Sequence, residues 1–320
     1  MALTLSDAQA LSDSKLCSQV IDEFRRDPLF DMMLFDNNAK AQGGKSLTYV
    51  YNRVTTLPTA AFRTIGSDYT AQEAKTTQFT VSLKPFGGSF EVDRILQSDE
   101  QQIMDLIQFE LSQKIKATKA LFTDTFINGD SETGNAFDGI DRALTSSNTE
   151  ITPAEAIDLS DSAKITANGN LFMDELDKML SELDSTPTAI LVNRKLASVI
   201  NGIARRSGYF STNESDAFGA PVTKYAGIPI IALGDKPGLA AGAETPIISV
   251  SDEGETSLYA VRIGLDGVHA ISPEGNNIVN TYLPNLAEPG AIKKGEVEMI
   301  SAVALKATRA AGVLRKIKVG

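Results

Sequence analysis

The sequence predicts an α+β protein that combines a mixed sheet, its flanking helices, one long separate helix and two extended segments. Three observations indicate this class. Residues 98–128 carry apolar side chains at helical spacing, residues 129–290 alternate between helix and strand patterns, and residues 291–320 show the alternation of strands. Elements of these kinds bury their apolar sides best when helices pack against a sheet.

Composition predicts a globular chain made in a reducing compartment. With 320 residues, of which 42% are hydrophobic and 22% charged, the chain is long enough to bury a large core. No apolar run reaches the ~18 residues that a membrane span needs, and the first residues lack the pattern of a signal peptide. The single cysteine, Cys17, excludes an internal disulfide and is typical of proteins from a reducing cytoplasm.

The charge of the chain argues against tight binding of nucleic acid. Its net value is −11, whereas proteins that bind phosphates tightly usually carry a basic surface. Residues 129–290 carry 10 basic and 23 acidic side chains, and residues 291–320 carry 7 basic and 2 acidic ones. This division predicts complementary surfaces between copies of the chain, with separately solvated faces as the alternative.

The first segment of the chain is predicted to be an amphipathic helix followed by an apolar stretch. The helix ends before Pro28, because proline stops a helix. Most side chains between Leu29 and Phe35 are large and apolar, and asparagines and glycines follow them. A segment this short cannot form its own core, so we expect it to lie on another surface. Its helical face consists of Leu16, Val20, Ile21 and Phe24.

Residues 47–95 are predicted to form a long two-stranded excursion with a polar tip. Residues 47–51 are rich in β-prone side chains, and Phe79, Val81 and Leu83 alternate with polar residues. A hairpin of this length has little to bury against itself and is marginally stable in water. We therefore expect this segment, too, to need a partner surface.

The strongest single element is a helix predicted from Ser98 to Asn128. Ser98 followed by Gln101 has the spacing of a capping box, and Gly129 is typical of the residue just after a helix. At 1.5 Å per residue the helix is a rod on the order of 40 Å long. Its apolar stripe consists of Ile103, Ile107, Leu111, Ile115, Phe122 and Phe126.

The remaining segments are predicted as shorter helices and strands. Residues 171–183 and 196–203 each have the apolar face of a helix. The predicted strands are residues 189–192, 227–231, 247–250, 258–261, 297–305 and 313–319.

The side chains that catalysis would need do not occur in a recognisable pattern. The only histidine, His269, lies in a strand-like run, and no G-x-S-x-G motif accompanies it. We therefore expect a packed or surface histidine rather than a catalytic base. Cys17 follows the apolar Leu16 and is expected to be a core or interface residue rather than a nucleophile. The sequence thus predicts no catalytic residues and no enzyme activity.

Metal and cofactor sites are also not predicted. One histidine and one cysteine cannot form a zinc site. Asp130, Glu132, Asp138 and Asp141 are close in the sequence but lack the spacing of a calcium-binding loop. The glycines near Gly129 match neither of the common phosphate-binding motifs.

A set of short motifs occurs in a fixed order along nearly the whole chain. Residues 90–96 precede the long helix, and residues 126–130 with 138–140 form a glycine-containing turn after it. The other motifs are residues 1–5 and 47–49 near the start, 187–193, 208–209 and 225–230 in the middle, and 309–317 at the end. Together they resemble the major capsid proteins of tailed bacteriophages, the family with the Hong Kong 97-type fold.

The resemblance implies a division of the chain. It implies an N-terminal arm at residues 1–44, an extended β-hairpin loop (E-loop) at 45–90, and a mixed-sheet axial domain at 129–290. A peripheral domain with a long spine helix would combine residues 91–128 with 291–320. The implied function is that of a major capsid protein, which assembles through hexamers and pentamers into an icosahedral head around double-stranded DNA.

The resemblance also implies partners and a location. The partners would be other copies of the chain, a portal, scaffolding and decoration proteins, and packaged double-stranded DNA bound without sequence specificity. The protein would be made in the host bacterial cytoplasm and end in the virion. Because the predicted arm starts close to Met1, we expect scaffolding to come from a separate protein.

The predicted assembly interface lies on the arm and the E-loop. Lys75 and Lys84 are included because some family members link a loop lysine to an asparagine of a neighbour, although no acid that would promote this reaction is identified. Two alternatives are an encapsulin-type shell, which resembles the same fold and encloses a cargo enzyme, and a hydrolase with an α/β core, for which no nucleophile motif is found. The predicted interface residues are Leu29, Phe30, Leu34, Phe35, Lys75, Phe79, Lys84 and Phe86.

Overall fold

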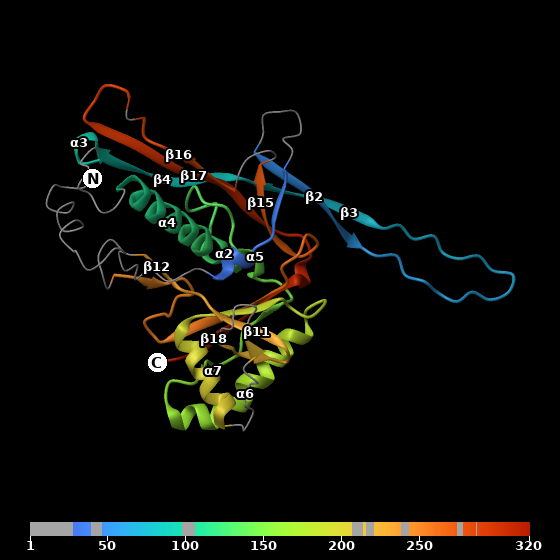
Figure 1. Ribbon diagram of the computed structural model, residues 1–320. Coiled ribbons are helices and arrows are strands. Elements are labelled where there is room, and N and C mark those ends of the chain that lie inside the picture. The colour runs from blue at the N-terminus through green and yellow to red at the C-terminus, as the bar shows by residue number, and fades with distance from the viewer. Residues whose placement is uncertain are drawn as a thin grey trace.

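The structure is an α+β fold with two large sheets, and the predicted class is confirmed. A long helix lies beside one sheet, two helices cover the other, and a hairpin projects from the body (Figure 1). This computed structural model describes residues 28–39, 47–97, 106–206, 214–215, 221–237, 243–273, 278–285 and 287–320. In those ranges no helix has the length and apolar character that crossing a membrane would need.

The first large sheet is built on two long antiparallel strands, β4 (Lys84–Asp93) and β17 (Ile292–Leu305). They pair without interruption from Asp93 opposite Ile292 to Lys84 opposite Ser301. Strand β17 also pairs with β15 (Val268–Pro273) and β16 (Val279–Tyr282). Strand β1 (Phe35–Ala39) adds a parallel edge to β15. Segments from the start, middle and end of the chain therefore share one sheet.

Helix α4 (Leu106–Asn128) covers one face of this sheet by packing against β4 and β17 (Figure 1). Phe122, Phe126 and Ile127 are fully buried there. The short helix α3 (Arg94–Gln97) precedes α4, and the predicted helix start at Ser98 lies outside the described residues. The predicted end at Asn128 is confirmed.

The second large sheet has the strand order β10-β11-β7-β14-β18-β5, and β6 also pairs with β18. Strand β7 (Ala189–Val192) is fully buried, as the apolar run predicts. The predicted strand at residues 247–250 is wrong: Ile247 and Ile248 are buried but lie in a bend after β13 (Thr245–Pro246). The other bounds are β5 (Glu150–Ile151), β6 (Ile157–Asp158), β10 (Lys224–Tyr225), β11 (Ile228–Ala232), β14 (Glu255–Val261) and β18 (Ala311–Lys318).

Helices α6 (Ser162–Ser181) and α7 (Arg194–Arg206) pack on the second sheet and against each other (Figure 1). Helix α6 begins nine residues before its predicted start, because the Asp161 side chain caps it by accepting from the backbone N–H groups of Ala163 and Lys164. The two halves of the molecule are joined at α4, where the Asn128 amide donates to the Ile247 carbonyl at 2.7 Å.

The strand pairing differs from the predicted division of the chain in two places. Residues 84–90 belong to β4 and hence to the first sheet, not to a separate loop. Strand β18 lies in the second sheet between β14 and β5, although residues 291–320 were all predicted for the peripheral domain. The chain changes sheets through a short 3-10 helix, Thr308–Ala310, which alternation patterns do not reveal.

The hairpin consists of β2 (Thr48–Thr56) and β3 (Lys75–Ser82), paired from Thr48 opposite Ser82 outwards. Residues 57–74 form its tip without helix or strand and extend far from the body (Figure 1). The smaller elements of the described chain are α2 (Pro28–Met32), α5 (Ile140–Leu144), β8 (Glu214–Ser215), β9 (Pro221–Val222) and β12 (Asp235–Lys236).

Candidate assembly surfaces

The base of the hairpin is fixed to the end of β17 by hydrogen bonds. Arg53 on β2 donates from Nε to the Lys306 carbonyl at 2.8 Å and from its second terminal nitrogen to the Leu305 carbonyl at 2.7 Å. The Tyr51 hydroxyl donates to the same Leu305 carbonyl at 3.0 Å. These bonds hold the root of the hairpin and leave its outer part without support from the body.

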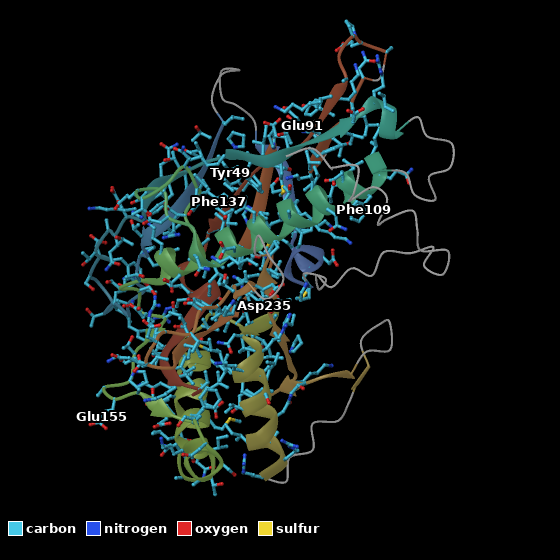
Figure 2. All side chains as sticks on the ribbon, turned by 90° about the vertical axis from the view of Figure 1, so that its left-hand side faces the viewer. Tyr49, Glu91, Phe109, Phe137, Glu155 and Asp235 are labelled. Atoms are coloured by element: carbon cyan, nitrogen blue, oxygen red, sulfur yellow. The ribbon has the colours of Figure 1, made fainter. Side chains whose placement is uncertain are left out.

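Aromatic packing completes the hairpin base. The rings of Tyr51 and Phe79 stack with centroids 5.8 Å apart, and the Arg53 guanidinium lies 4.3 Å from the Phe79 centroid. Tyr49, labelled in Figure 2 in the half of the molecule that holds α4, donates to Asp36 at 3.1 Å. Phe79, a predicted interface residue, is therefore half-buried within its own chain.

The outer part of the hairpin presents apolar and uncharged side chains to solvent. Along one face of β2, Val50 and Val54 are exposed, and they stand opposite Thr80 and Thr76 of β3. From Thr48 to Val54, this face and the residues opposite it on β3 carry no charged side chain, and Lys75 pairs with Thr56 at the outer end. Exposed apolar side chains on such a face offer a surface for contact with another protein.

The tip carries the most exposed apolar side chains of the described chain. Phe62 and Ile65 are 107% and 104% exposed, and Leu57 and Tyr69 are 76% and 66% exposed. The prediction of a polar tip is therefore wrong. The sequence signal was weak because these residues stand singly among threonine, alanine and serine, which looks like an ordinary loop. We name Leu57, Phe62, Ile65 and Tyr69 the tip patch.

A tight turn shapes the tip patch. The Ser67 N–H donates to the Thr64 carbonyl at 3.2 Å, and Gly66 has a φ of +93°, a conformation that favours glycine. Arg63 donates to the Ser67 carbonyl at 3.0 Å and lies 5.4 Å from the Tyr69 ring centroid. The turn therefore gives the tip a defined local shape.

Within the described part of the arm, residues 28–39, several apolar side chains pack on their own chain. Leu29 is fully buried, so it has no surface to offer another subunit in this arrangement, a correction to the predicted interface. The rings of Phe30 and Phe35 lie 5.6 Å and 5.7 Å from that of Phe122 on α4. Leu34 is 43% exposed, and its predicted interface role stays a prediction. The predicted helix at residues 16–24 lies outside the described residues.

The other predicted interface residues are scattered. Phe86 on β4 is half-buried, with its ring 6.5 Å from Phe122 and 6.2 Å from Phe137, which Figure 2 labels. Lys84 is half-buried opposite Ser301, whereas Lys75 is exposed at the outer end of β3. The two lysines therefore lie at different places, one on the body and one on the projecting hairpin.

A second group of exposed apolar residues lies at the end of the first sheet where β16 ends and β17 begins. Ile95, Tyr282, Leu283 and Ile292 are between 55% and 71% exposed. The Arg94 N–H donates to the Ala291 carbonyl at 2.9 Å and so brings the segments together. Sequence reasoning missed this group because its members come from three separate segments.

The acidic residues considered as metal ligands are paired with arginines. Arg142 contacts Asp130, Asp138 at 3.2 Å and Glu132 at 2.5 Å. Asp141 accepts from Arg315 at 2.7 Å. Among the described residues no cluster of histidine, cysteine and carboxylates suited to a metal ion is found.

Part of the basic C-terminal segment is neutralised within the chain. Arg315 on β18 pairs with Asp141 and with Glu150, and Asp141 also accepts from the Tyr259 hydroxyl at 2.7 Å. Burial, together with the Asp141 carboxylate, raises the pKa of Tyr259 well above its usual value. This network ties β18, α5 and β14 together and pairs the Arg315 charge within the chain.

Comparison with known proteins identifies the fold. Neither protein-family models nor curated proteins match the chain. The SrpI encapsulin complex from Synechococcus elongatus is similar with a TM-score of 0.66 and 15% identity, over 99% of this chain and 97% of that chain. The capsid of a native GTA particle is similar with a TM-score of 0.61 and 15% identity, over 98% of this chain and 100% of that chain. The capsid of Myoviridae phage XM1 is similar with a TM-score of 0.54 and 13% identity, over 94% of this chain and 95% of that chain. The chain therefore has the Hong Kong 97-type capsid fold.

Proposed function

We propose that the chain is the major capsid protein of a tailed bacteriophage and is not an enzyme. Copies of it assemble through hexamers and pentamers into an icosahedral head that encloses double-stranded DNA. The fold supports this proposal, as do the capsids among its structural neighbours. The single observation that carries it is the projecting hairpin, whose apolar tip patch the described part of its own chain does not cover.

The tip patch favours assembly on energetic grounds. Burial of apolar surface stabilises a contact by about 25 cal/mol per Å². Burial of a few hundred Å² per joint therefore contributes on the order of 5–8 kcal/mol. The cost of ordering the contact is then subtracted from this contribution. Each subunit makes this contact with a neighbour and receives it from another, so weak joints add up over a closed shell.

The proposed roles of the segments follow from the resemblance and from the strand pairing of the two sheets. The arm (1–44) and the E-loop tie subunits together, the first sheet with α4 forms the peripheral domain, and the second sheet with α6 and α7 forms most of the axial domain. Leu34 and Lys75 remain candidate interface residues, as do the half-buried Phe30, Phe35, Phe79, Lys84 and Phe86. Portal, scaffolding and decoration proteins are the proposed partners, the virion is the proposed location, and the host bacterial cytoplasm is the proposed place of synthesis.

The packaged DNA is proposed to be held without specific contacts. Residues 129–290 carry a net charge of −13, from 10 basic and 23 acidic side chains. An acidic surface that faces the DNA repels its phosphates, so the genome slides instead of adhering.

A double substitution at the tip tests the role of the hairpin. Phe62→Ser with Ile65→Ser removes the two most exposed apolar side chains and is expected to reduce shell formation at least tenfold, because the joint loses most of its buried area. Electron microscopy and sedimentation measure the shells, and circular dichroism checks that the fold is retained.

The matched control lies in the same tip. Ala60→Ser with Ala61→Ser adds the same hydroxyl groups to exposed positions without removing a large apolar side chain. This control is expected to assemble like the unaltered chain. Wild-type yields of shells from the Phe62 and Ile65 double variant would contradict the proposed role of the tip patch.

An encapsulin-type protein shell is the second candidate, because an encapsulin is among the similar structures, with a TM-score of 0.66. The content of particles isolated from their native source distinguishes the two. Nuclease-protected double-stranded DNA supports the phage head, whereas an enclosed protein without DNA supports the encapsulin.

A further inference from the structure

The single histidine lies where three parts of the chain meet. His269 on β15 is fully buried, and β15 runs between β1 of the arm and β17 of the first sheet. The ring of Tyr49, from the hairpin strand β2, packs edge-on against the imidazole with centroids 5.9 Å apart. One side chain is thus covered by the arm, the hairpin and the body.

Neither ring nitrogen makes a hydrogen bond of full geometry within the described part of the chain, although the Gly264 backbone is close enough to favour the protonated ring. The nearest carboxylate oxygen, Oδ2 of Asp36 on β1, lies 3.9 Å from Nε2, too far for a hydrogen bond. That same oxygen already accepts from the Tyr49 hydroxyl at 3.1 Å. A neutral ring has one N–H donor, whereas the protonated ring has two donors and a charge, so burial without partners penalises the protonated form most.

Charged groups near the ring come from β1 and from the segments that flank β15 and β17, whereas β2 contributes the uncharged Tyr49 ring. Lys306, just after β17, disfavours a second positive charge, whereas Asp36 on β1, Asp266 in the turn before β15 and the backbone of Gly264 favour it. Burial is the largest effect and, with Lys306, lowers the pKa of His269 to about 4. The carboxylates therefore do not compensate for the loss of water around the ring.

We propose that His269 is a proton-sensitive latch for the joint at which β1 and β2 rest on the first sheet. The neutral ring fits under the two strands. A protonated ring needs water or an anion at its nitrogens, and lifting of β2 or β1 is what admits them. Acid therefore loosens the arm and the hairpin base before it affects the second sheet. The inference concerns one chain and holds whether or not the proposed shell function is correct.

The size of the effect follows from the two states of the joint. In the open joint the hydrated imidazole has its ordinary pKa of about 6.5, and in the closed joint the pKa is about 4. The closed joint therefore has its full stability above pH 6.5 and loses it as the pH falls towards 4. The ratio of open to closed joints is expected to rise about 20-fold between pH 7 and pH 5.

Hydrogen–deuterium exchange of the purified full-length chain at pH 7 and pH 5, corrected for the intrinsic rate, tests the latch. Protection of peptides from β1 and β2 is expected to fall about 20-fold at pH 5, while peptides from β7 and β14 in the second sheet keep theirs. An equal loss in all four strands would mean general acid unfolding and would overturn the proposal.

Substitutions separate the histidine from other titrating groups. His269→Leu is expected to abolish the difference between the two pH values, whereas Ser272→Ala, a buried control on the same strand, keeps it. If His269→Leu does not fold, His269→Asn decides instead, because asparagine keeps a polar side chain at this position but does not titrate between pH 7 and pH 5. Persistence of the pH effect in His269→Leu or in His269→Asn would refute the latch.

Discussion

Gly129 ends helix α4 at a point where the backbone leaves no room for a side chain. A Cβ at this position would lie 2.2 Å from the Phe137 carbonyl oxygen and 2.5 Å from that of Thr125. The Gly129 carbonyl in turn accepts from the Gly139 N–H at 2.8 Å. The close approach of these segments places Phe137 against the aromatic cluster of α4.

Gly129→Ala is expected to lower the free energy of unfolding by about 2–3 kcal/mol, because backbone atoms must move to admit the methyl group. Urea denaturation of the unassembled chain measures the change. Gly134→Ala is the control: its Cβ would meet backbone atoms only at 3.8 Å and 3.9 Å. The argument from crowding would be wrong if the two substitutions had equal effects.

Single residues were predictable where their role is local and unpredictable where it depends on distant strands. Gly129 was placed at the end of the long helix because a glycine after an apolar stripe is a local signal. The burial of His269 under Tyr49 depends on strands that are far apart in the sequence, so the sequence left open whether it is packed or on the surface. The tip patch was missed for the opposite reason, since isolated apolar residues in a polar stretch give no periodic signal.

At the scale of elements, α6 and α7 meet closely through a glycine in the middle of α6. A Cβ on Gly169 would lie 3.5 Å from two side-chain carbons of Ile203 on α7, which is ordinary van der Waals contact. Glycine in a helix interior is less favourable than alanine, because it loses more conformational freedom on folding.

Gly169→Ala is therefore expected to stabilise the chain by about 0.5–1 kcal/mol. Thermal or urea unfolding of the unassembled chain measures this gain. Ala167→Gly, at an exposed position of the same helix, should change stability by a similar amount in the opposite direction. A loss of stability in Gly169→Ala would show that the contact with Ile203 is tighter than the structure indicates.

Elements with strong periodicity were predicted well, whereas their partners were not. The end of α4 and the buried strand Ala189–Val192 follow from apolar patterns in the sequence. The parallel pairing of β1 with β15, and the place of β18 in the second sheet, depend on contacts between distant segments that no local pattern encodes. The predicted strand at residues 247–250 failed because buried apolar residues also occur in bends.

At the scale of the whole molecule, the body and the projecting hairpin differ in exposure. The two sheets bury their apolar residues in large clusters, whereas residues 57–74 have no buried member. Exposed tips without regular structure are preferred sites of proteolysis. Arg63 lies in this tip beside Phe62.

Trypsin is therefore expected to cut the unassembled chain first after Arg63, leaving fragments that stay associated through β2 and β3 and the body. Mass spectrometry of a short digest identifies the cut. Assembly is expected to slow this cleavage at least tenfold, because a neighbour covers the tip in the proposed shell. Arg63→Gln should remove the cut, and equal cleavage of free and assembled chains would argue against coverage of the tip.

The attachment of the hairpin gives it a mechanical consequence. Arg53 and Tyr51 hold the carbonyls of Leu305 and Lys306, and the chain passes from the first sheet to the second immediately after these residues. A force applied at the tip of the hairpin therefore produces a torque at the point where the chain crosses from the first sheet to the second. In the proposed shell, we expect strain that a neighbour imposes on the hairpin to turn the two halves of the molecule relative to each other, so that changes of curvature spread from subunit to subunit.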